Sequence, residues 1–482
     1  MIEKFLNNPK AEKIFFGLIL VLLAVLFFWF LMNSEGFVGD ADSATHYRFA
    51  RYSWKYPEYF LDHWAKPVFT LLASPFAQFG HSGVSVFNLL AGLASVFFVW
   101  LIARKLEYSN RLLIPVFIFF TPIYASLVIS GQVEVLFGLF IVAISWFSLD
   151  KKYMLAAILL SIAPFARTEG IFLIPIYGLY FILEKQYKVI PYMLTGTILY
   201  SIAGLFIYND LFWLITRMPY WGKATEYGTG SLFHFFDAWH KIFSLINGVF
   251  ILIGVAAILT AWIRKRDQKN IAALFLIMLP FAAYFTAHVL MWNLGIGRSL
   301  GLHRYMIAIV PVGALLALKG FDVISLYLKE QLKAPVASAI LAVILAIVVI
   351  YTPFTLYRIP QKADVKSRVI LDAAEFIQKE QLNDKKIYFY EPSFIVYLEL
   401  DPQDSLQAKE LVHYAAKPHY RIKEGEIVIW DGQFSPNQLG PVDVLKDSPY
   451  FELVKTFDPS EPITFFDKPY SLSIFRRNDL KE

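Results

Sequence analysis

The sequence predicts an α-helical polytopic membrane protein with about eleven transmembrane helices, interfacial helices in the first outer loop and a small soluble α/β domain at its C-terminal end. Of the 482 residues, 57% are hydrophobic and only 17% are charged. A soluble domain has roughly 45–50% apolar and about 25% charged residues. Apolar runs recur as far as Pro353, and the composition then becomes polar and charged. We therefore expect a transmembrane domain over 1–358 and an extracytoplasmic α/β domain over 359–482.

A membrane helix needs about 20 mostly apolar residues. In chain order, the predicted spans are Ile14–Met32, Val84–Ala103, Leu112–Ile129, Val133–Leu149, Met154–Phe165, Ile171–Leu183, Val189–Tyr208, Ile246–Ile263, Ile271–Trp292, Tyr305–Leu318 and Val336–Pro353. We expect the first run to remain as a helix, because no small-residue cleavage site follows it. The run Pro67–Phe79 is too short to span and is bounded by proline, so it predicts a re-entrant or interfacial helix.

Basic residues concentrate in alternate loops, with the densest cluster at Arg264–Lys269. The positive-inside rule then places the N-terminus in the cytoplasm and the C-terminal domain outside it. The net charge of +5 is spread over these short loops, so it indicates orientation and no nucleic-acid partner. The chain has no cysteine, which excludes disulfides and a thiol nucleophile. These features fit a multi-pass protein of a bacterial inner membrane, with a periplasmic C-terminal domain.

The C-terminal domain combines helix and strand patterns. Residues Val369–Glu380 have helical periodicity, while Lys386–Tyr390 and Glu426–Trp430 are typical of short buried strands. Its length of roughly 120 residues is within the usual range for a domain.

The first outer loop holds an acidic pair, Asp40 and Asp42, directly after the first span. Carboxylates at the end of a membrane helix are costly unless they serve chemistry or a cation. Two residues apart, the pair shares one side only if the segment is extended. Beyond Asp42 the sequence predicts a short amphipathic helix that lies on the membrane surface. The residues spaced for one face of this helix are Ala44, Tyr47, Ala50, Arg51 and Trp54.

Several roles fit these side chains. Asp42 is suited to cap the following helix, to act as general base on a hydroxyl or amine, or to bind a divalent cation such as Mg²⁺ or Mn²⁺ together with Asp40. His46 lies one helical turn beyond Asp42. His63, at the end of the loop, can return to the same pocket. For both histidines the alternative is an ordinary interfacial or loop position.

This loop resembles the first-loop motif of the C-type glycosyltransferase superfamily (GT-C), in the branch of protein O-mannosyltransferases and the lipid A aminoarabinose transferase. Asp42 and Ala50 occupy the Asp and Ala positions of that motif. Lys66-Pro67 matches the start of the family's Lys-Pro-Pro-Leu motif, and Arg304-Tyr305 followed by Pro311 resembles its late Arg-Tyr and proline helix. A soluble α/β domain after the last span also recurs in the superfamily.

The sequence departs from the family pattern at two positions of the first loop. Ser43 replaces the second acidic residue, and His46 stands where tyrosine is usual. Asp40 would then supply the second carboxylate from a displaced position. That displacement changes the expected geometry and leaves any metal dependence open.

The resemblance implies an integral-membrane glycosyltransferase with an inverting mechanism. It would move a sugar from a polyprenyl-phosphate donor in the membrane lipid to a glycan, lipid or protein acceptor on the extracytoplasmic face, with Asp42 as base, aided by Asp40. The candidate partners of the donor phosphate are Arg304, Lys66, Arg167 and Arg298. The candidate substrate contacts are His46, His63, Glu169, His303, Trp221 and Glu134.

Plainer roles exist for most of these candidates. Arg304 can snorkel to the membrane interface, and Arg167 can form a structural ion pair with Glu169. Trp221 lies in an aromatic-rich loop that is also typical of an interfacial belt. Glu134 can make a hydrogen bond inside the helix bundle.

Three other functions remain as alternatives. A transporter or flippase for lipid-linked sugars would be expected to show paired halves or broken helices at mid-membrane. A polysaccharide polymerase or ligase would carry its main polar loop late in the chain. A non-catalytic scaffold would use the C-terminal domain as its working part.

Overall fold

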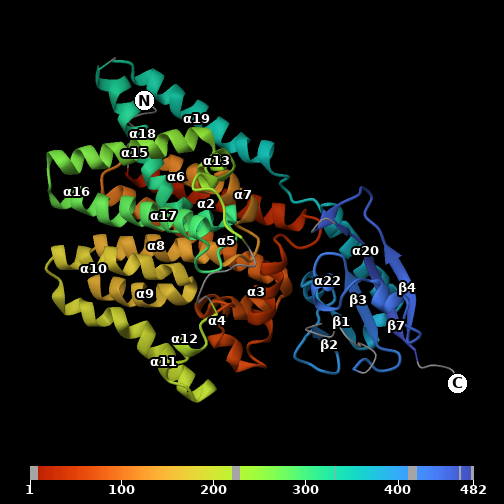
Figure 1. Ribbon diagram of the computed structural model, residues 1–482. Helices are drawn as coiled ribbons and strands as arrows, with labels where there is room; N and C mark the ends of the chain where they lie inside the picture. Colours follow the sequence, from red (N-terminus) through yellow and green to blue (C-terminus); the bar gives the residue numbers. More distant parts are fainter. Residues whose placement is uncertain (1–8, 220–227, 332, 411–420, 466–467, 479–482) are drawn as a thin grey trace.

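The computed structural model describes residues 9–219, 228–331, 333–410, 421–465 and 468–478. It contains a helical region and a smaller α/β domain, which lie side by side in Figure 1. Helix α19 (Pro335–Leu356) leads from the first to α20 (Val365–Lys379) of the second. The predicted boundary at 358/359 lies between these two helices.

Among the residues that the structure describes, seven helical segments are long and apolar enough to cross a membrane. They are Lys10–Met32, Gly80–Lys105, Tyr187–Tyr208, Leu245–Arg264, Gln268–Leu294, His303–Gln331 and Val336–Leu356. Four shorter apolar helices are Pro67–Ala77, Val133–Leu149, Tyr153–Ala166 and Thr168–Leu183. The polytopic helical architecture is confirmed, and the run at Pro67 is a short helix as expected.

The predicted span Leu112–Ile129 is wrong as one continuous helix. The chain there forms η2 (Arg111–Leu113), α6 (Ile114–Phe119) and α7 (Pro122–Leu127). Thr121 is extended, with φ −68° and ψ 127°. The ring of a proline disfavours helical backbone at the preceding residue, so Pro122 interrupts the helix.

The remaining long helices keep the predicted order with shifted ends. They are α2 (Pro9–Met32), α5 (Gly80–Lys105), α8 (Val133–Leu149), α9 (Tyr153–Ala166), α10 (Leu173–Leu183), α11 (Thr195–Tyr208), α15 (Leu245–Arg264), α17 (Leu279–Leu294) and α18 (Val310–Leu326). Shorter helices connect them: α3 (Ala41–Tyr52), η1 (Pro57–Leu61), α4 (Pro67–Ala77), η3 (Thr168–Phe172), η4 (Tyr187–Leu194), α12 (Trp213–Thr216), α13 (His234–Asp237), α14 (Trp239–Ile242), α16 (Gln268–Ala273), η5 (Leu274–Met278), η6 (His303–Ile309) and η7 (Tyr327–Gln331).

The C-terminal domain is built on a five-stranded sheet of order β2-β1-β3-β7-β4. Strands β1 (Ile387–Phe389) and β3 (Ile427–Asp431) are parallel and buried, which confirms the two strands expected from the sequence. The expected helix is α20. The other elements are η8 (Leu382–Asp384), α21 (Ser393–Tyr397), β2 (Ala408–Glu410), α22 (Ser435–Gln438), α23 (Asp443–Lys446), β4 (Phe451–Phe457), β5 (Thr464–Phe465), β6 (Lys468–Pro469) and β7 (Leu472–Arg477).

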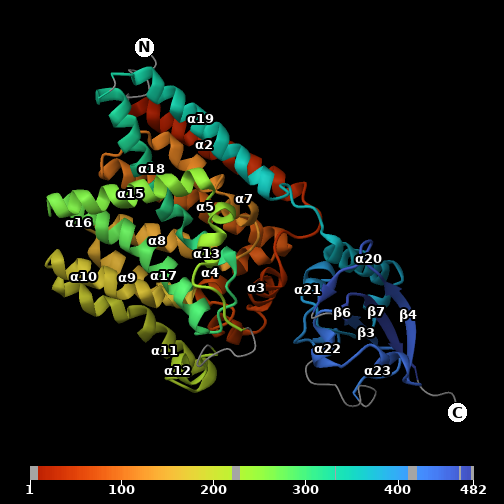
Figure 2. The same cartoon turned by 45° about the horizontal axis from the view of Figure 1, so that its top comes forward.

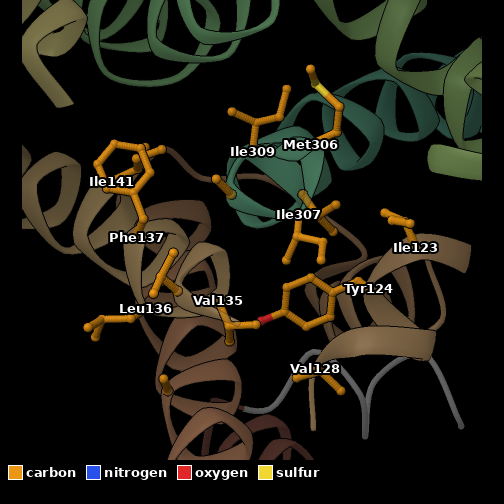
Figure 3. Packing of buried hydrophobic residues seen from close by; sticks show 14 of the residues in the cluster. Ile123, Tyr124, Val128, Val135, Leu136, Phe137, Ile141, Met306, Ile307 and Ile309 are labelled. Carbon is orange, nitrogen blue, oxygen red and sulfur yellow. The ribbon is translucent and has the colours of Figure 1, made fainter. Parts of the chain in front are cut away.

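A close-packed core fixes α8 against η6. Figure 3 shows Val135, Leu136 and Phe137 of α8 near Ile307 of η6 and Tyr124 of α7. All of these side chains are almost fully buried. Each segment carries a charged residue at its start, Glu134 on α8 and Arg304 on η6. Packing between the two apolar segments therefore brings these charges together.

Helix α3 lies between the helical region and the C-terminal domain in both Figure 1 and Figure 2. Three residues of its predicted common face, Ala44, Tyr47 and Ala50, are at most 1% exposed, whereas Arg51 is only partly buried. Trp54 lies beyond the end of α3 and is 67% exposed, so it does not belong to that buried face. Helix α3 packs on α4 and α5 on one side and on α21 of the C-terminal domain on the other.

Candidate active site

Arg304 joins the two carboxylates of the first loop. Its Nη1 donates to Asp40 Oδ2 at 2.7 Å, and its Nη2 donates to Asp42 Oδ2. The guanidinium is 8% exposed, whereas the Asp42 carboxylate is 38% exposed. A planar guanidinium has a fixed set of donors, so one arginine can hold two carboxylates in a defined arrangement. Asp40 and Asp42 therefore face one site, as expected if the segment before α3 is extended.

Asp40, and not Asp42, caps helix α3. Its backbone is extended, and its Oδ1 accepts hydrogen bonds from the amides of Asp42 and Ser43. The cap interpretation of Asp42 is therefore wrong, because the helix begins one residue before that position. Gln132 adds a hydrogen bond of 2.8 Å from Nε2 to Asp40 Oδ1. Asp40 is thus held in place by backbone, amide and guanidinium donors together.

Arg167 forms a second, deeper cluster. Its Nη1 lies 2.5 Å from Glu134 Oε1, and its Nη2 lies 2.5 Å from Glu169 Oε1. All three side chains are at most 11% exposed. His288 Nε2 lies 3.4 Å from Glu169 Oε1. The ion pair expected between Arg167 and Glu169 is present, and Glu134 extends it toward Arg304 Nε at 4.0 Å.

Both clusters line one cavity of about 530 Å³. Eight of the predicted residues contribute to its wall: Asp42, His46, Lys66, Glu134, Arg167, Glu169, Arg298 and Arg304. Apolar side chains complete it, among them Trp64, Phe172, Met291 and Ile296. Cavities for small ligands typically measure about 300–1,000 Å³ and combine apolar walls with a few polar groups. This cavity has that size and that character.

His46 and Trp64 form an aromatic part of the wall. Their rings stack at 4.8 Å, and His46 is 5% exposed. Burial lowers the pKa of His46 well below its usual value of 6.5, and the nearby charges of Lys66 and Arg304 act in the same direction. His46 therefore offers a neutral ring to the cavity at physiological pH.

Lys66 and Arg298 are the other cations of the cavity wall. Lys66 Nζ donates to the carbonyl of His63 at 3.2 Å and lies 3.4 Å from Thr168 Oγ1. Arg298 is exposed, and its side chain forms no ion pair or hydrogen bond with any residue that the structure describes. Arg298 is therefore available to an anion without breaking an existing contact.

Two predicted substrate contacts, His63 and His303, are not among the residues that line the cavity, and a third lies outside the described residues. His63 packs on Trp213, with 4.6 Å between the rings, and burial lowers the pKa of His63. His303 packs on His234, with 4.9 Å between the rings. Trp221 lies in 220–227, outside the described residues.

Several polar atoms around the cavity are buried without a hydrogen-bond partner in the described part of the chain. They include Gln132 Oε1, Glu134 Oε2, His46 Nδ1 and Arg304 Nε. Buried polar atoms normally have partners, and functional sites are the common exception. The polar lining is therefore incompletely satisfied by the protein's own described groups.

The carboxylates do not match a divalent-cation site in this arrangement. Among the described residues, no group of three or more His, Asp or Glu side chains is placed to hold a metal ion. Asp40 and Asp42 both bond to Arg304 instead.

His288 is the main site residue that the sequence did not single out. His288 falls within an apolar helix, α17, where a helical pattern alone does not tell which side faces a cavity. An ionisable residue inside a predicted span is nevertheless a signal for a functional position. Gln132 stands next to the predicted fourth span, and its role depends on Asp40, a residue 92 positions away.

Comparisons with known proteins agree with this fold. A family model, Glycosyltransferase family 87, matches residues 66–291. The match includes Lys66, Glu134, Arg167 and His288 but neither Asp42 nor Arg304. No curated protein sequence matches the chain.

Three solved structures share the fold at 12% sequence identity. ArnT from Cupriavidus metallidurans, bound to undecaprenyl phosphate, aligns with a TM-score of 0.65 over 97% of this chain and 98% of its own. The Archaeoglobus fulgidus oligosaccharyltransferase, tethered to an acceptor peptide, aligns at 0.53 over 89% and 70%. The arabinofuranosyltransferase AftD from Mycobacteria aligns at 0.50 over 96% and 40%.

By its fold, the protein is a helical membrane protein with several candidate spans, similar to these solved glycosyltransferase structures. The family model covers less than half of the chain, and the solved structures share its fold at low sequence identity.

Proposed function

We propose that this protein transfers a sugar from a polyprenyl-phosphate donor to an acceptor on the extracytoplasmic face of a bacterial inner membrane, with inversion at the anomeric carbon. One observation carries the proposal: Asp42 and four basic side chains line the same cavity. A carboxylate suits deprotonation of an acceptor, and guanidinium or ammonium groups suit a phosphate. ArnT, the structure with the same overall fold, was solved with undecaprenyl phosphate.

The donor phosphate would meet Arg298 and Lys66 first. Arg298 makes no contact with the described residues that binding would have to break. Arg304 and Arg167 are already paired with carboxylates. We therefore assign initial phosphate binding to Arg298 and Lys66, and charge stabilisation during the reaction to Arg304.

Asp42 would act as the base. It takes the proton of the acceptor hydroxyl or amine, and the acceptor atom forms a bond to the anomeric carbon. The bond from that carbon to the phosphate oxygen breaks, and its electron pair stays on the phosphate. One negative charge thus moves from Asp42 to the leaving phosphate.

Arg304 is placed to stabilise that charge first on Asp42 and then on the phosphate. In the resting site it bonds to Asp42. Once Asp42 is protonated, that bond weakens and Nη2 can turn to the phosphate, while Nη1 stays on Asp40. Asp40 would thus be a positioning residue that keeps Arg304 near the reacting atoms. Stabilising charge that appears only in the transition state is an efficient source of rate.

The test is transfer from a panel of undecaprenyl-phosphate sugars by the protein in membranes, with products identified by mass spectrometry. Asp42→Asn is expected to abolish transfer and to leave donor binding in place. Glu58→Gln is the matched control, because Glu58 is an exposed carboxylate of the same loop and does not line the cavity. Full activity of Asp42→Asn would rule out the base role. Movement of labelled lipid without a new glycosidic bond would favour a transporter instead.

A further inference from the structure

The C-terminal domain contacts the helix that carries Asp42. Arg48 Nη1 of α3 lies 2.5 Å from Glu410 Oε1 at the end of β2. Tyr52 Oη donates to the carbonyl of Glu399 at 3.0 Å. Both contacts lie on the half of α3 opposite its N-terminal end, where Asp42 meets Arg304.

The C-terminal domain makes a second contact with the residues that directly follow α3. Asp401 Oδ2 accepts hydrogen bonds from Lys55 Nζ at 2.9 Å and from Tyr56 Oη at 3.0 Å. The Asp401 side chain is 5% exposed. A buried carboxylate without hydrogen-bond donors strongly destabilises the folded protein. This contact therefore favours one position of the chain after α3.

The Arg48–Glu410 pair also supports the aromatic wall of the cavity from behind. The Arg48 guanidinium lies 4.8 Å from the centre of the Phe49 ring. Phe49 contacts Trp64 at 6.0 Å, and Trp64 stacks on His46 at 4.8 Å. Trp64 and His46 line the cavity. Packed aromatic rings transmit a displacement, because the interior has little free space.

Helix α3 is short and continuous, so its two ends move together. From Asp42 to Tyr52 it measures roughly 15 Å at 1.5 Å per residue. One end is fixed by Arg304 and Gln132, and the other by the C-terminal domain. A misplacement of about 1 Å at a reacting group can cost on the order of a hundredfold in rate.

We propose that the C-terminal domain is a positioning element of the active site, and that Glu410 and Asp401 are its positioning residues. They act through Arg48, Lys55 and Tyr56 to set the place of α3, and with it the place of Asp42. This inference depends on the proposed function for its kinetic part. The structural part, that the domain holds α3, stands independently of it.

The chain offers a matched control for this contact. Glu35 pairs with Arg368 at 2.6 Å and with Lys362 at 3.1 Å, which also connects the helical region to the C-terminal domain. The side chains of Glu35 and Glu410 are similarly exposed, at 35% and 32%. The Glu35 contacts do not involve α3. A Glu35 variant loses a contact between the domains but keeps the support of α3. It therefore separates the two effects.

The experiment uses the full chain in nanodiscs. It compares the single variants Glu410→Gln, Glu410→Asp and Glu35→Gln with a double variant in which the two charges are swapped, Arg48→Glu together with Glu410→Arg. Hydrogen–deuterium exchange of the amides of α3 is the first readout. We expect faster exchange in Glu410→Gln, little change in Glu410→Asp and Glu35→Gln, and recovery in the exchanged pair. Unchanged exchange in Glu410→Gln would overturn the proposal.

Steady-state kinetics with the undecaprenyl-phosphate sugar used by the wild type are the second readout. We expect kcat to fall about tenfold in Glu410→Gln, with KM for the donor changed much less, because α3 carries the base rather than the phosphate contacts. Faster exchange with an unchanged kcat would overturn the positioning role. If the wild type transfers none of the sugars, the proposed function fails, and the exchange measurement alone decides whether the domain holds α3.

Discussion

At the scale of single residues, the site depends on the sharing of Arg304 between two carboxylates. Asp40 is committed to capping α3 and to Gln132, whereas Asp42 is half-buried and lines the cavity. Asp40 and Asp42 therefore have different roles, because they stand at different positions relative to the start of α3. Sequence alone predicted the pair but not the division, because the start of α3 decides which carboxylate is the cap.

Arg304→Lys should reduce transfer strongly. A lysine has one ammonium group and cannot hold two carboxylates in a fixed fork. We expect kcat to fall on the order of 10²–10³-fold, similar to loss of an anion-stabilising donor. Arg298→Lys is the comparison, since a single contact to phosphate tolerates that change and should mainly raise KM. Equal effects of the two substitutions on kcat would contradict the special role of Arg304.

His46 should make the folded protein less stable in acid. Burial lowers the pKa of His46 well below 6.5, so the folded state keeps the ring neutral while the unfolded chain takes up a proton. Its contribution to stability is fully present above pH 6.5 and is lost as the pH falls below that value. We expect thermal unfolding between pH 5 and pH 8 to depend less on pH in His46→Gln than in the wild type. An identical pH dependence in both proteins would refute this assignment.

At the scale of elements, packing between α8 and η6 brings Glu134 and Arg304 together. Gly138 allows this close approach, because a Cβ at that position would lie 3.0 Å from the carbonyl oxygen of Ala308 and 3.3 Å from Pro311 Cγ. The sequence predicted both apolar segments, but not their contact. The break of the third predicted span at Pro122 was also missed, because hydropathy does not register the restriction that proline places on the residue before it.

Gly138→Val should therefore displace η6 and lower both stability and activity. Overpacking of a filled core costs about 1–3 kcal/mol. Gly17→Ala in α2 is the control, because its Cβ would meet no atom within 4 Å. Thermal unfolding in detergent, together with transfer activity, would test the difference. A neutral effect of Gly138→Val would mean that α8 and η6 can separate without loss.

At the scale of the whole molecule, the protein combines a helical region of several spans with a C-terminal α/β domain. Strand β3 is buried on both faces: Ile427 and Ile429 pack on one side, and Val428 and Trp430 on the other. The sequence predicted this division, because composition changes sharply between the two regions. It did not predict the contacts between them, since Arg48 and Glu410 are 362 residues apart.

Residues 359–482 should fold without the helical region. The sheet is covered by α20 on one face and by α22 and α23 on the other, so helices of the domain itself pack on both faces of the sheet. We expect a mixed α/β circular dichroism spectrum and a cooperative thermal transition. A gradual, non-cooperative transition would show that the domain requires the helical region for its own stability.

Lys66 has a backbone conformation that lysine rarely adopts, with φ 63° and ψ 93° immediately before Pro67. Such a conformation costs roughly 1–3 kcal/mol and persists only where the surroundings enforce it. Glycine at this position would relieve the strain but would remove an ammonium group from the cavity wall. A substitution chosen to raise thermal stability by relaxing this backbone would therefore remove a positive charge from the cavity wall.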